Sequence, residues 1–321
     1  METIATHEGR DVRQAILRDG EVSVTFLSFG AILSDWRVPD RRGVAQSVTL
    51  GFDQFAPYRD SDRAFGIIAG RVANRIKNAR FPFEGTVVEV DRNLGEHHIH
   101  GGALGLGRQH FDLEADASTA RLTLKSPDGA MGYPGNVDFT FDIALKGHTL
   151  TFDLKAVPDR PTPVALAQHS YFRLGAPAQE HVMTIHAANT TALDEALIPT
   201  GAIVPVEGTA LDFRAPRTIG DTQIDRNFCL DQKDPAVVLE TEAYALTLRT
   251  DRPGLQVYNG FNFPTFDVAG HDGIHYGPYP GIALEAQDFP DALNNPSFPS
   301  IIVTPDRPYR QVTSITITPK D

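Results

Sequence analysis

The fold class is decided by a stretch near the middle of the chain, Val137-Asp138-Phe139-Thr140-Phe141-Asp142-Ile143, in which apolar and polar residues alternate. A period of two is typical of a β-strand with one buried face and one solvated face. A second alternating run, at residues 150–154, follows after Lys146-Gly147-His148, and the glycine suits the positive φ of a short hairpin loop. The two runs therefore predict an antiparallel hairpin.

The same alternation continues outward in both directions. Further runs lie at residues 22–26, 246–248, 255–258 and 314–318. Helical periodicity is weak, and 27 Gly and 23 Pro leave little room for long helices. No linker, low-complexity tract or short-period repeat divides the chain. We therefore expect an all-β protein, folded as one domain over residues 1–321 in a large antiparallel β-sandwich.

Charge and composition narrow the function. Subtracting 41 Asp and Glu from 29 Lys and Arg gives a formal net charge of −12, so neither nucleic acid nor an acidic membrane is an expected partner. The single cysteine, Cys229, excludes an internal disulfide and a cysteine-rich zinc site. The first residues lack the apolar stretch of a signal peptide, and no segment approaches the ~18 consecutive apolar residues of a membrane span. We expect a cytoplasmic protein.

Two polar segments in the first third of the chain are candidates for a binding site. In G-R-V-A-N-R-I at residues 70–76, Asn74 and Arg75 offer several hydrogen-bond donors, which suits vicinal sugar hydroxyls. The plainer alternative is a solvated turn with two surface arginines. In E-H-H-I-H-G-G at residues 96–102, the two glycines allow a close backbone approach, which makes His100 the histidine expected to face a pocket. His97 and His98 are expected to be exposed.

The histidine cluster also raises the question of a metal. On a strand, His98 and His100 would share one face, yet a zinc site needs a third ligand and an orienting second layer of hydrogen bonds. No H-E-x-x-H or paired-cysteine motif supplies them. We therefore expect no metal.

Two later segments are candidates for proton transfer. His169 stands in Q-H-S-Y-F-R-L-G at residues 168–175, where a structural histidine is the plainer alternative; no G-x-S-x-G elbow supports Ser170 as a nucleophile. Glu285 follows an apolar run at residues 281–284, and partial desolvation there raises a carboxyl pKa toward that of a general base. Asp225 and Gln256 are polar residues among β-forming neighbours and are uninformative on their own.

Taken together and in order, these segments resemble the aldose 1-epimerase (galactose mutarotase) family from about residue 29 to the end of the chain. The family's G-R-x-A-N-R-I is met at residues 70–76, its L-H-G-G at 99–102 with Ile for Leu, and its H-S-Y-F at 169–172. Its D-x-N-F, G-x-Q-x-Y and L-E-x-Q-x-x-P-D-A segments are met at residues 225–228, 254–258 and 284–292. Six motifs that occur in the same order along one chain are specific evidence for this resemblance.

The resemblance implies an isomerase that interconverts the α and β anomers of a free neutral monosaccharide without a cofactor. It implies Glu285 as the general base and His169 as the general acid, with the sugar held by a set of polar side chains: Asn74, Arg75, His100, Asp225 and Gln256. The chemistry fits these residue types, because ring opening removes the proton from O1 and protonates the ring oxygen O5, which a carboxylate and an imidazolium can do.

Two departures from the family pattern bear on the choice of sugar. Arg173 stands where the family commonly has Asn, and residues 96–98 replace a more Asn-rich approach to L-H-G-G. One alternative is a hexose-6-phosphate 1-epimerase, for which Arg71, Arg75 and Arg173 would have to converge on the phosphate. The other is a non-catalytic sugar-binding or regulatory module of the same fold. The sequence allows a monomer or a homodimer.

Overall fold

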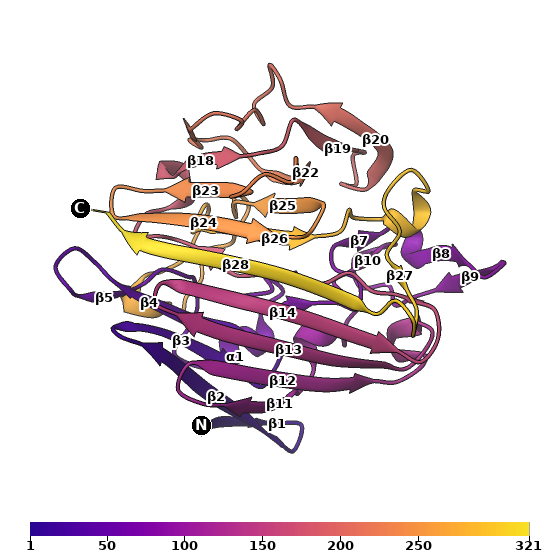
Figure 1. Ribbon diagram of the computed structural model, residues 1–321, viewed down its shortest axis with the longest axis horizontal. Coiled ribbons are helices and arrows are strands. Elements are labelled where there is room, and N and C mark those ends of the chain that lie inside the picture. The colour runs from indigo at the N-terminus through magenta and orange to yellow at the C-terminus, as the bar shows by residue number, and fades with distance from the viewer. Residues whose placement is uncertain (321) are drawn as a thin grey trace.

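The computed structural model describes residues 1–320, and its strands form three principal antiparallel sheets (Figure 1). The largest has nine strands, in this order: β11 (Asp112–Ala115), β12 (Thr119–Ser126), β13 (Val137–Lys146), β14 (Thr149–Pro158), β28 (Tyr309–Pro319), β24 (Tyr244–Thr250), β23 (Val237–Glu240), β18 (Val182–Ile185) and β21 (Arg217–Thr218). Figure 1 shows β28, near the C-terminus, running between β14 and β24.

A six-stranded and a five-stranded sheet complete the framework. The first runs in the order β17 (Tyr171–Phe172), β26 (Ile282–Gln287), β25 (Gly254–Tyr258), β22 (Asp225–Cys229), β19 (Asn189–Leu193) and β20 (Pro199–Pro205). The second is a meander of β1 (Glu2–His7), β2 (Arg10–Asp19), β3 (Val22–Leu27), β4 (Leu33–Pro39) and β5 (Ala45–Ser47).

Short elements connect these sheets. Four two-stranded ribbons pair β10 (His98–Ile99) with β7 (Arg75–Ile76), β15 (Thr162–Pro163) with β27 (Ile302–Val303), β16 (Ala167–Gln168) with β6 (Ile68–Ala69), and β8 (Arg80–Phe83) with β9 (Thr86–Glu89). The helices are α1 (Ala56–Asp60) and the 3₁₀ turns η1 (Lys77–Ala79), η2 (Leu106–Arg108), η3 (Ala130–Gly132), η4 (Ala178–Glu180), η5 (His271–Gly273) and η6 (Ala292–Asn294). Within residues 1–320, no helix has the length and apolar character needed to cross a membrane.

The predicted hairpin is confirmed. Strands β13 and β14 pair from Val137 opposite Pro158 to Lys146 opposite Thr149, and Gly147 in the intervening loop has φ 55°. The inward residues of β13, among them Phe139 and Phe141, are buried. Each of the other predicted alternating runs also lies in a strand, namely β3, β24, β25 and β28.

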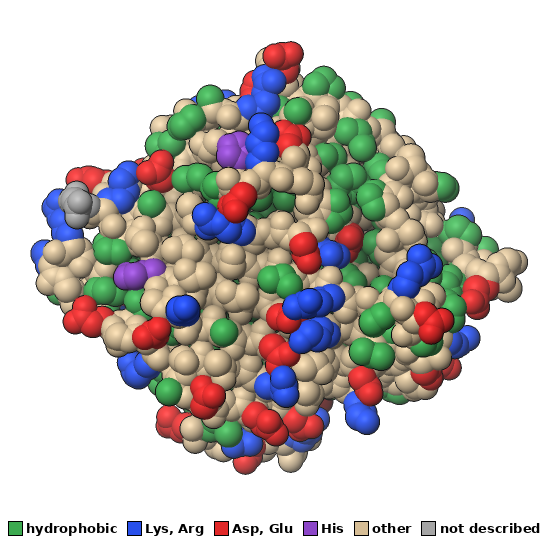
Figure 2. Space-filling view, viewed as in Figure 1, with side chains coloured by type: hydrophobic (Ala, Val, Ile, Leu, Met, Phe, Trp, Pro, Cys, Tyr) green, Lys and Arg blue, Asp and Glu red, His purple; other side chains and the backbone are tan. Residues whose placement is uncertain are grey.

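The outward face of the nine-stranded sheet carries the polar half of the alternation. Asp142 accepts hydrogen bonds from Arg121 and Lys155, and Asp153 accepts two from Arg310. Figure 2 shows acidic and basic side chains interspersed over the face that contains these strands. Exposed pairs of this kind contribute little to stability individually, so burial of the inward face is the main stabilising term.

One hydrophobic core joins the sheets. Leu255 and Val257 of β25 and Leu284 of β26 belong to the same cluster as Phe139, Phe152 and other inward residues of the nine-stranded sheet. The six-stranded sheet therefore packs one face against the nine-stranded sheet, as the predicted sandwich requires. The shared core also favours the predicted single domain, which stays a prediction. Since side chains alternate along a strand, Gln256 and Glu285 must point to the opposite face.

Candidate active site

A cavity of about 580 Å³ lies on that opposite face. Residues from all parts of the chain line it, including every residue that the sequence singled out as a site candidate: Asn74, Arg75, His100, His169, Asp225, Gln256 and Glu285. The volume is in the usual range for a small-molecule site. The structure thus brings the seven predicted residues together, although they are spread over more than 200 positions of sequence.

Three of them lie on adjacent strands of the six-stranded sheet. Gln256 of β25 pairs with Glu285 of β26, and Asp225 begins the neighbouring strand β22, which pairs with β25. Gln256 Nε2 donates to Asp225 Oδ1 at 2.5 Å, and Arg75 Nη2 donates to Asp225 Oδ2 at 3.4 Å. Both oxygens of Asp225 are therefore engaged, which fixes the carboxylate in one orientation.

His169 reaches the same place from a short connection. It lies between β16 and β17, and its Nε2 is 3.4 Å from Glu285 Oε1. The two side chains are 6% and 2% exposed. Glu285 Oε2 and His169 Nδ1 have no hydrogen-bond partner among residues 1–320. The carboxyl group and the imidazole are thus held in contact. The second oxygen of Glu285 and the second ring nitrogen of His169 are available to hydrogen-bond a ligand.

Burial shifts both members of this pair. It raises the pKa of the Glu285 carboxyl well above its usual value, with the negative charge of Asp225 adding to the effect and Arg75 opposing it. Burial also lowers the pKa of His169 to about 4. The sequence-based prediction assigned an imidazolium to His169. Burial therefore favours the neutral ring over the imidazolium, because desolvation penalises its charge.

His100 lies beside the pair and departs from the expected strand geometry. Strand β10 ends at Ile99, and His100 has φ 52°, so the chain turns and brings the ring against His169, with ring centroids 5.2 Å apart at 76°. Burial, followed by the positive charges that His169 and Arg75 can carry, lowers the pKa of His100 well below its usual value.

The prediction for His98 was wrong. His98 is fully buried: its Nδ1 lies 2.6 Å from the Asp91 carbonyl oxygen and its Nε2 lies 2.6 Å from Tyr133 Oη. It does not share a face with His100, because β10 is only two residues long and the left-handed turn at His100 interrupts the alternation. Burial lowers the pKa of His98, which favours the neutral, structural form.

The alternative reading of Arg71 as a surface arginine was also wrong. Arg71 is 3% exposed and donates to the carbonyl oxygens of Ser126, Pro127 and Pro134 as well as to Ser126 Oγ. Burial lowers the pKa of its guanidinium to about 10. Arg71 therefore anchors the backbone of the G-R-V-A-N-R-I segment instead of facing the cavity.

Several cavity residues were not singled out by the sequence. Tyr171 and Tyr258 stand inside recognised motifs, so their position beside His169 and Gln256 was a usable signal. Phe261, Asn262, Arg63 and Arg108 also line the cavity, but they lie in irregular segments without a local pattern. The position of these four side chains at the cavity depends on how the loops fold back over the sheet.

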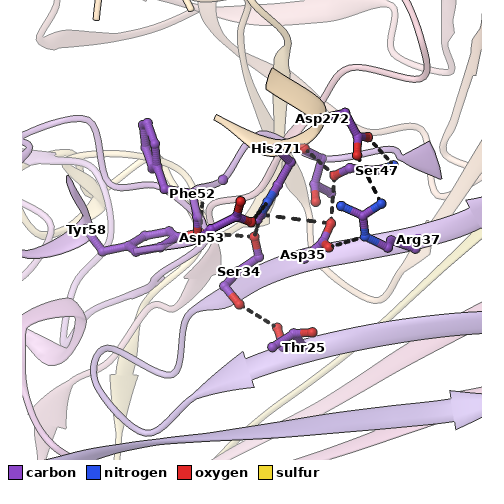
Figure 3. Close-up of polar contacts among 12 residues, drawn as sticks. Thr25, Ser34, Asp35, Arg37, Ser47, Phe52, Asp53, Tyr58, His271 and Asp272 are labelled. Carbon is purple, nitrogen blue, oxygen red and sulfur yellow. Dashed lines mark hydrogen bonds and ion pairs between the residues drawn. The ribbon is translucent and has the colours of Figure 1, made fainter. Parts of the chain in front are cut away.

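One of these loops, residues 259–281, is anchored by polar contacts to residues in the first part of the chain (Figure 3). His271 Nδ1 lies 2.9 Å from Asp53 Oδ1 and its Nε2 lies 2.8 Å from the Ser34 carbonyl oxygen. Asp272 accepts hydrogen bonds from Arg37 and from the backbone N–H of Ser47. The N-terminal sheet therefore holds the base of the loop whose other end places Phe261 and Asn262 at the cavity.

The same fold assembles three groups that are able to ligate a metal. One ligand atom each of His100, His169 and Glu285 lies within 4.8 Å of the others. His169 and Glu285 lie far from His100 in the sequence, so no local motif indicates this set of ligands. The expected absence of a metal stays a prediction.

Comparisons with known proteins identify the family of this chain. The family model for aldose 1-epimerase matches residues 13–316. Galactose mutarotase from Rattus norvegicus is 35% identical over 95% of this chain and 94% of its own length. An aldose epimerase homologue from C. elegans has a TM-score of 0.91 at 26% identity, covering 97% of this chain and all of that one.

A second solved structure, galactose 1-epimerase from Lactobacillus acidophilus, has a TM-score of 0.88 at 27% identity and covers all of this chain and 98% of its own. The all-β fold and the family that the six motifs predicted are both confirmed. The protein belongs to the aldose 1-epimerase family.

Proposed function

We propose that this protein interconverts the α and β anomers of a free, neutral aldose, with Glu285 as general base and His169 as general acid. The observation that carries the assignment of roles is the buried contact of 3.4 Å between the two side chains. Opening a pyranose requires a proton to leave O1 and a proton to reach O5, and both oxygens are bonded to the same carbon. The acid and the base must therefore be close neighbours.

The pair needs to hold only one proton. When the Glu285 carboxylate accepts the O1 proton and the His169 imidazolium gives its proton to O5, the pair ends with a protonated carboxyl and a neutral ring. The number of protons on the pair is unchanged. After rotation about C1–C2, ring closure on the other face of the aldehyde reverses both transfers and gives the other anomer.

Burial weakens the preference of the pair for the charged arrangement. In water, pKa values of about 4.3 for Glu and 6.5 for His favour the ion pair by roughly 3 kcal/mol. In the cavity the pKa of Glu285 is raised and that of His169 is lowered, so this preference for the ion pair shrinks. The neutral arrangement, with a protonated carboxyl and an uncharged ring, is the one that ring opening leaves behind, and the cavity therefore stabilises it.

The remaining cavity residues suit hydroxyl groups. Asp225, Arg75 and Gln256 form a connected set that presents both acceptors and donors. The Nε of Arg75 has no partner among residues 1–320. A buried polar group left unpaired costs about 1–3 kcal/mol, so a ligand with several hydroxyls is favoured over an apolar one.

The arrangement of arginines favours a neutral sugar over a phosphorylated one. Arg71 is buried elsewhere, and Arg173 donates to the Pro280 carbonyl oxygen, so they do not converge with Arg75. Arg108 lines the cavity, but its guanidinium donates to three backbone carbonyls. Arg63 lies 3.1 Å from Asp62. A non-catalytic module is less favoured, because the acid and base are in direct contact.

Replacing the proton-transfer groups tests the assignment of roles. Glu285→Gln and His169→Asn should each lower kcat at least ~10²-fold, the usual contribution of a positioned proton-transfer group. Turnover is measured by polarimetry on freshly dissolved α-glucose and α-galactose, after subtraction of the spontaneous rate. Glu207→Gln, at a side chain that is 76% exposed, is the matched control and should leave kcat unchanged.

Circular dichroism verifies that each variant is folded. Wild-type turnover in Glu285→Gln would remove Glu285 from the mechanism. A change confined to KM in His169→Asn would make His169 a binding residue.

Chelation tests the expected absence of a metal. Because proton transfer accounts for the reaction, activity should be unchanged after exhaustive dialysis against a chelator. Loss of turnover that one particular divalent metal restores would instead make His100, His169 and Glu285 a metal site.

Substrate charge tests the preference for a neutral aldose. A phosphate dianion in this cavity would lose hydration and meet Asp225 and Glu285, which is unfavourable unless several free cations converge on it. We expect kcat/KM for glucose to exceed that for glucose 6-phosphate at least ~10-fold, or about 1.4 kcal/mol. Exchange NMR on the two sugars side by side measures the ratio, and a preference for the phosphate would overturn the assignment.

A further inference from the structure

Asn74 and His100 are joined by reciprocal hydrogen bonds. The backbone N–H of His100 donates to the Asn74 carbonyl oxygen at 3.1 Å. In return, the backbone N–H of Asn74 donates to the ring nitrogen Nδ1 of His100 at 3.2 Å. The side-chain oxygen of Asn74 is also engaged, since it accepts the backbone N–H of Arg75 at 2.8 Å. Much of Asn74 is therefore committed to its protein neighbours.

The second of these bonds determines where the proton on His100 lies. A backbone N–H can only donate, so Nδ1 must offer a lone pair. In a neutral imidazole the hydrogen must then be on Nε2. An imidazolium would place a second N–H against that of Asn74, and burial separately lowers the pKa of His100 well below its usual value.

The other ring nitrogen of His100, Nε2, is available to a ligand. His100 lines the cavity, and its Nε2 has no hydrogen-bond partner among residues 1–320. The ring lies against that of His169, beside the acid–base pair. A donor at Nε2 is therefore positioned next to the atoms that exchange protons in the proposed function.

We propose that Asn74 is a positioning residue whose backbone N–H holds His100 as the neutral Nε2–H tautomer, so that His100 donates a hydrogen bond to the sugar but does not carry the transferred proton. This inference rests on the proposed function. It assigns different roles to the two histidines: His169 exchanges the proton, and His100 donates a hydrogen bond to an oxygen atom of the sugar. It also argues against His100 as a metal ligand, because the cavity-facing nitrogen carries hydrogen in place of the lone pair that a metal needs.

The identity of residue 74 follows from its backbone. Asn74 has φ 61°, in the left-handed region that Asn and Gly adopt more readily than other residues. The neighbouring chain is tightly packed, since a Cβ on Gly101 would lie 1.7 Å from the Gly70 carbonyl oxygen. The two segments that carry Asn74 and His100 are thus held in close register, and the direction of the Asn74 N–H depends on its φ.

The tautomer can be measured without turnover. In protein labelled with ¹⁵N-histidine, two-bond ¹H–¹⁵N correlations distinguish a protonated from an unprotonated ring nitrogen, and His100→Gln assigns the signals. We expect His100 to show a protonated Nε2 and an unprotonated Nδ1 at neutral pH. An imidazolium or an Nδ1–H tautomer in the wild-type protein would overturn the inference, even if the enzyme turns over normally.

A pair of variants tests the role of Asn74. Asn74→Gly retains access to positive φ and loses the side chain, whereas Asn74→Ala disfavours that φ. We expect Asn74→Gly to keep the tautomer, and Asn74→Ala to show mixed tautomers with kcat/KM at least ~10-fold below that of Asn74→Gly.

Thermal unfolding checks that both variants fold, and the wild-type spectrum decides the tautomer if either does not. Equal loss of activity in both, with the tautomer intact, would show that Asn74 acts through its side-chain amide and would overturn the positioning role. A wild-type protein with the expected tautomer and no turnover on any aldose would instead contradict the proposed function.

Discussion

Burial of a carboxylate and an imidazole in contact is the constraint on which the rest of the structure depends. Glu285 and His169 are almost fully removed from solvent and lie 3.4 Å apart. Desolvation penalises both charges, and the penalty appears as opposite pKa shifts that move the proton of the pair from the ring toward the carboxyl. Under the proposed function, this desolvation favours the neutral pair that ring opening leaves behind.

The sandwich provides this environment through the alternation of its strands. Leu284 and Ala286 of β26 enter the core shared with the nine-stranded sheet, so Glu285 between them faces the cavity. The same holds for Gln256 between Leu255 and Val257 on β25. A slip of one residue in either strand would exchange core and site residues, so the apolar packing that stabilises the fold also fixes the register of the site. The cavity of this aldose 1-epimerase family member thus lies on the face of the six-stranded sheet opposite the hydrophobic core.

The regular parts of this arrangement could be predicted from sequence, and the irregular parts could not. Residues 137–143 and 255–258 alternate clearly, so their strands and inward faces followed from periodicity. His98 was expected to be an exposed loop residue, but its burial depends on contacts with the Asp91 carbonyl and with Tyr133, for which the local sequence carries no signal. The burial of Arg71 depends on backbone carbonyls more than 50 residues away, for which the sequence carries no local signal. The seven candidate residues were found through motif order, whereas their mutual distances are a property of the folded sheets.

The pH dependence of kcat/KM tests the buried pair most directly. Adding a second proton to the pair creates net positive charge in a buried site beside Arg75, so the acid limb should lie near pH 4, the value to which burial lowers the pKa of His169. The account predicts that kcat/KM at pH 5 is at least about half of its value at pH 7, with no acid-side inflection at the ordinary histidine pKa of about 6.5. A value at pH 5 below about one tenth of that at pH 7, with the protein still folded by circular dichroism, would show a solvated histidine that must lose its proton, and would contradict the shared-proton pair.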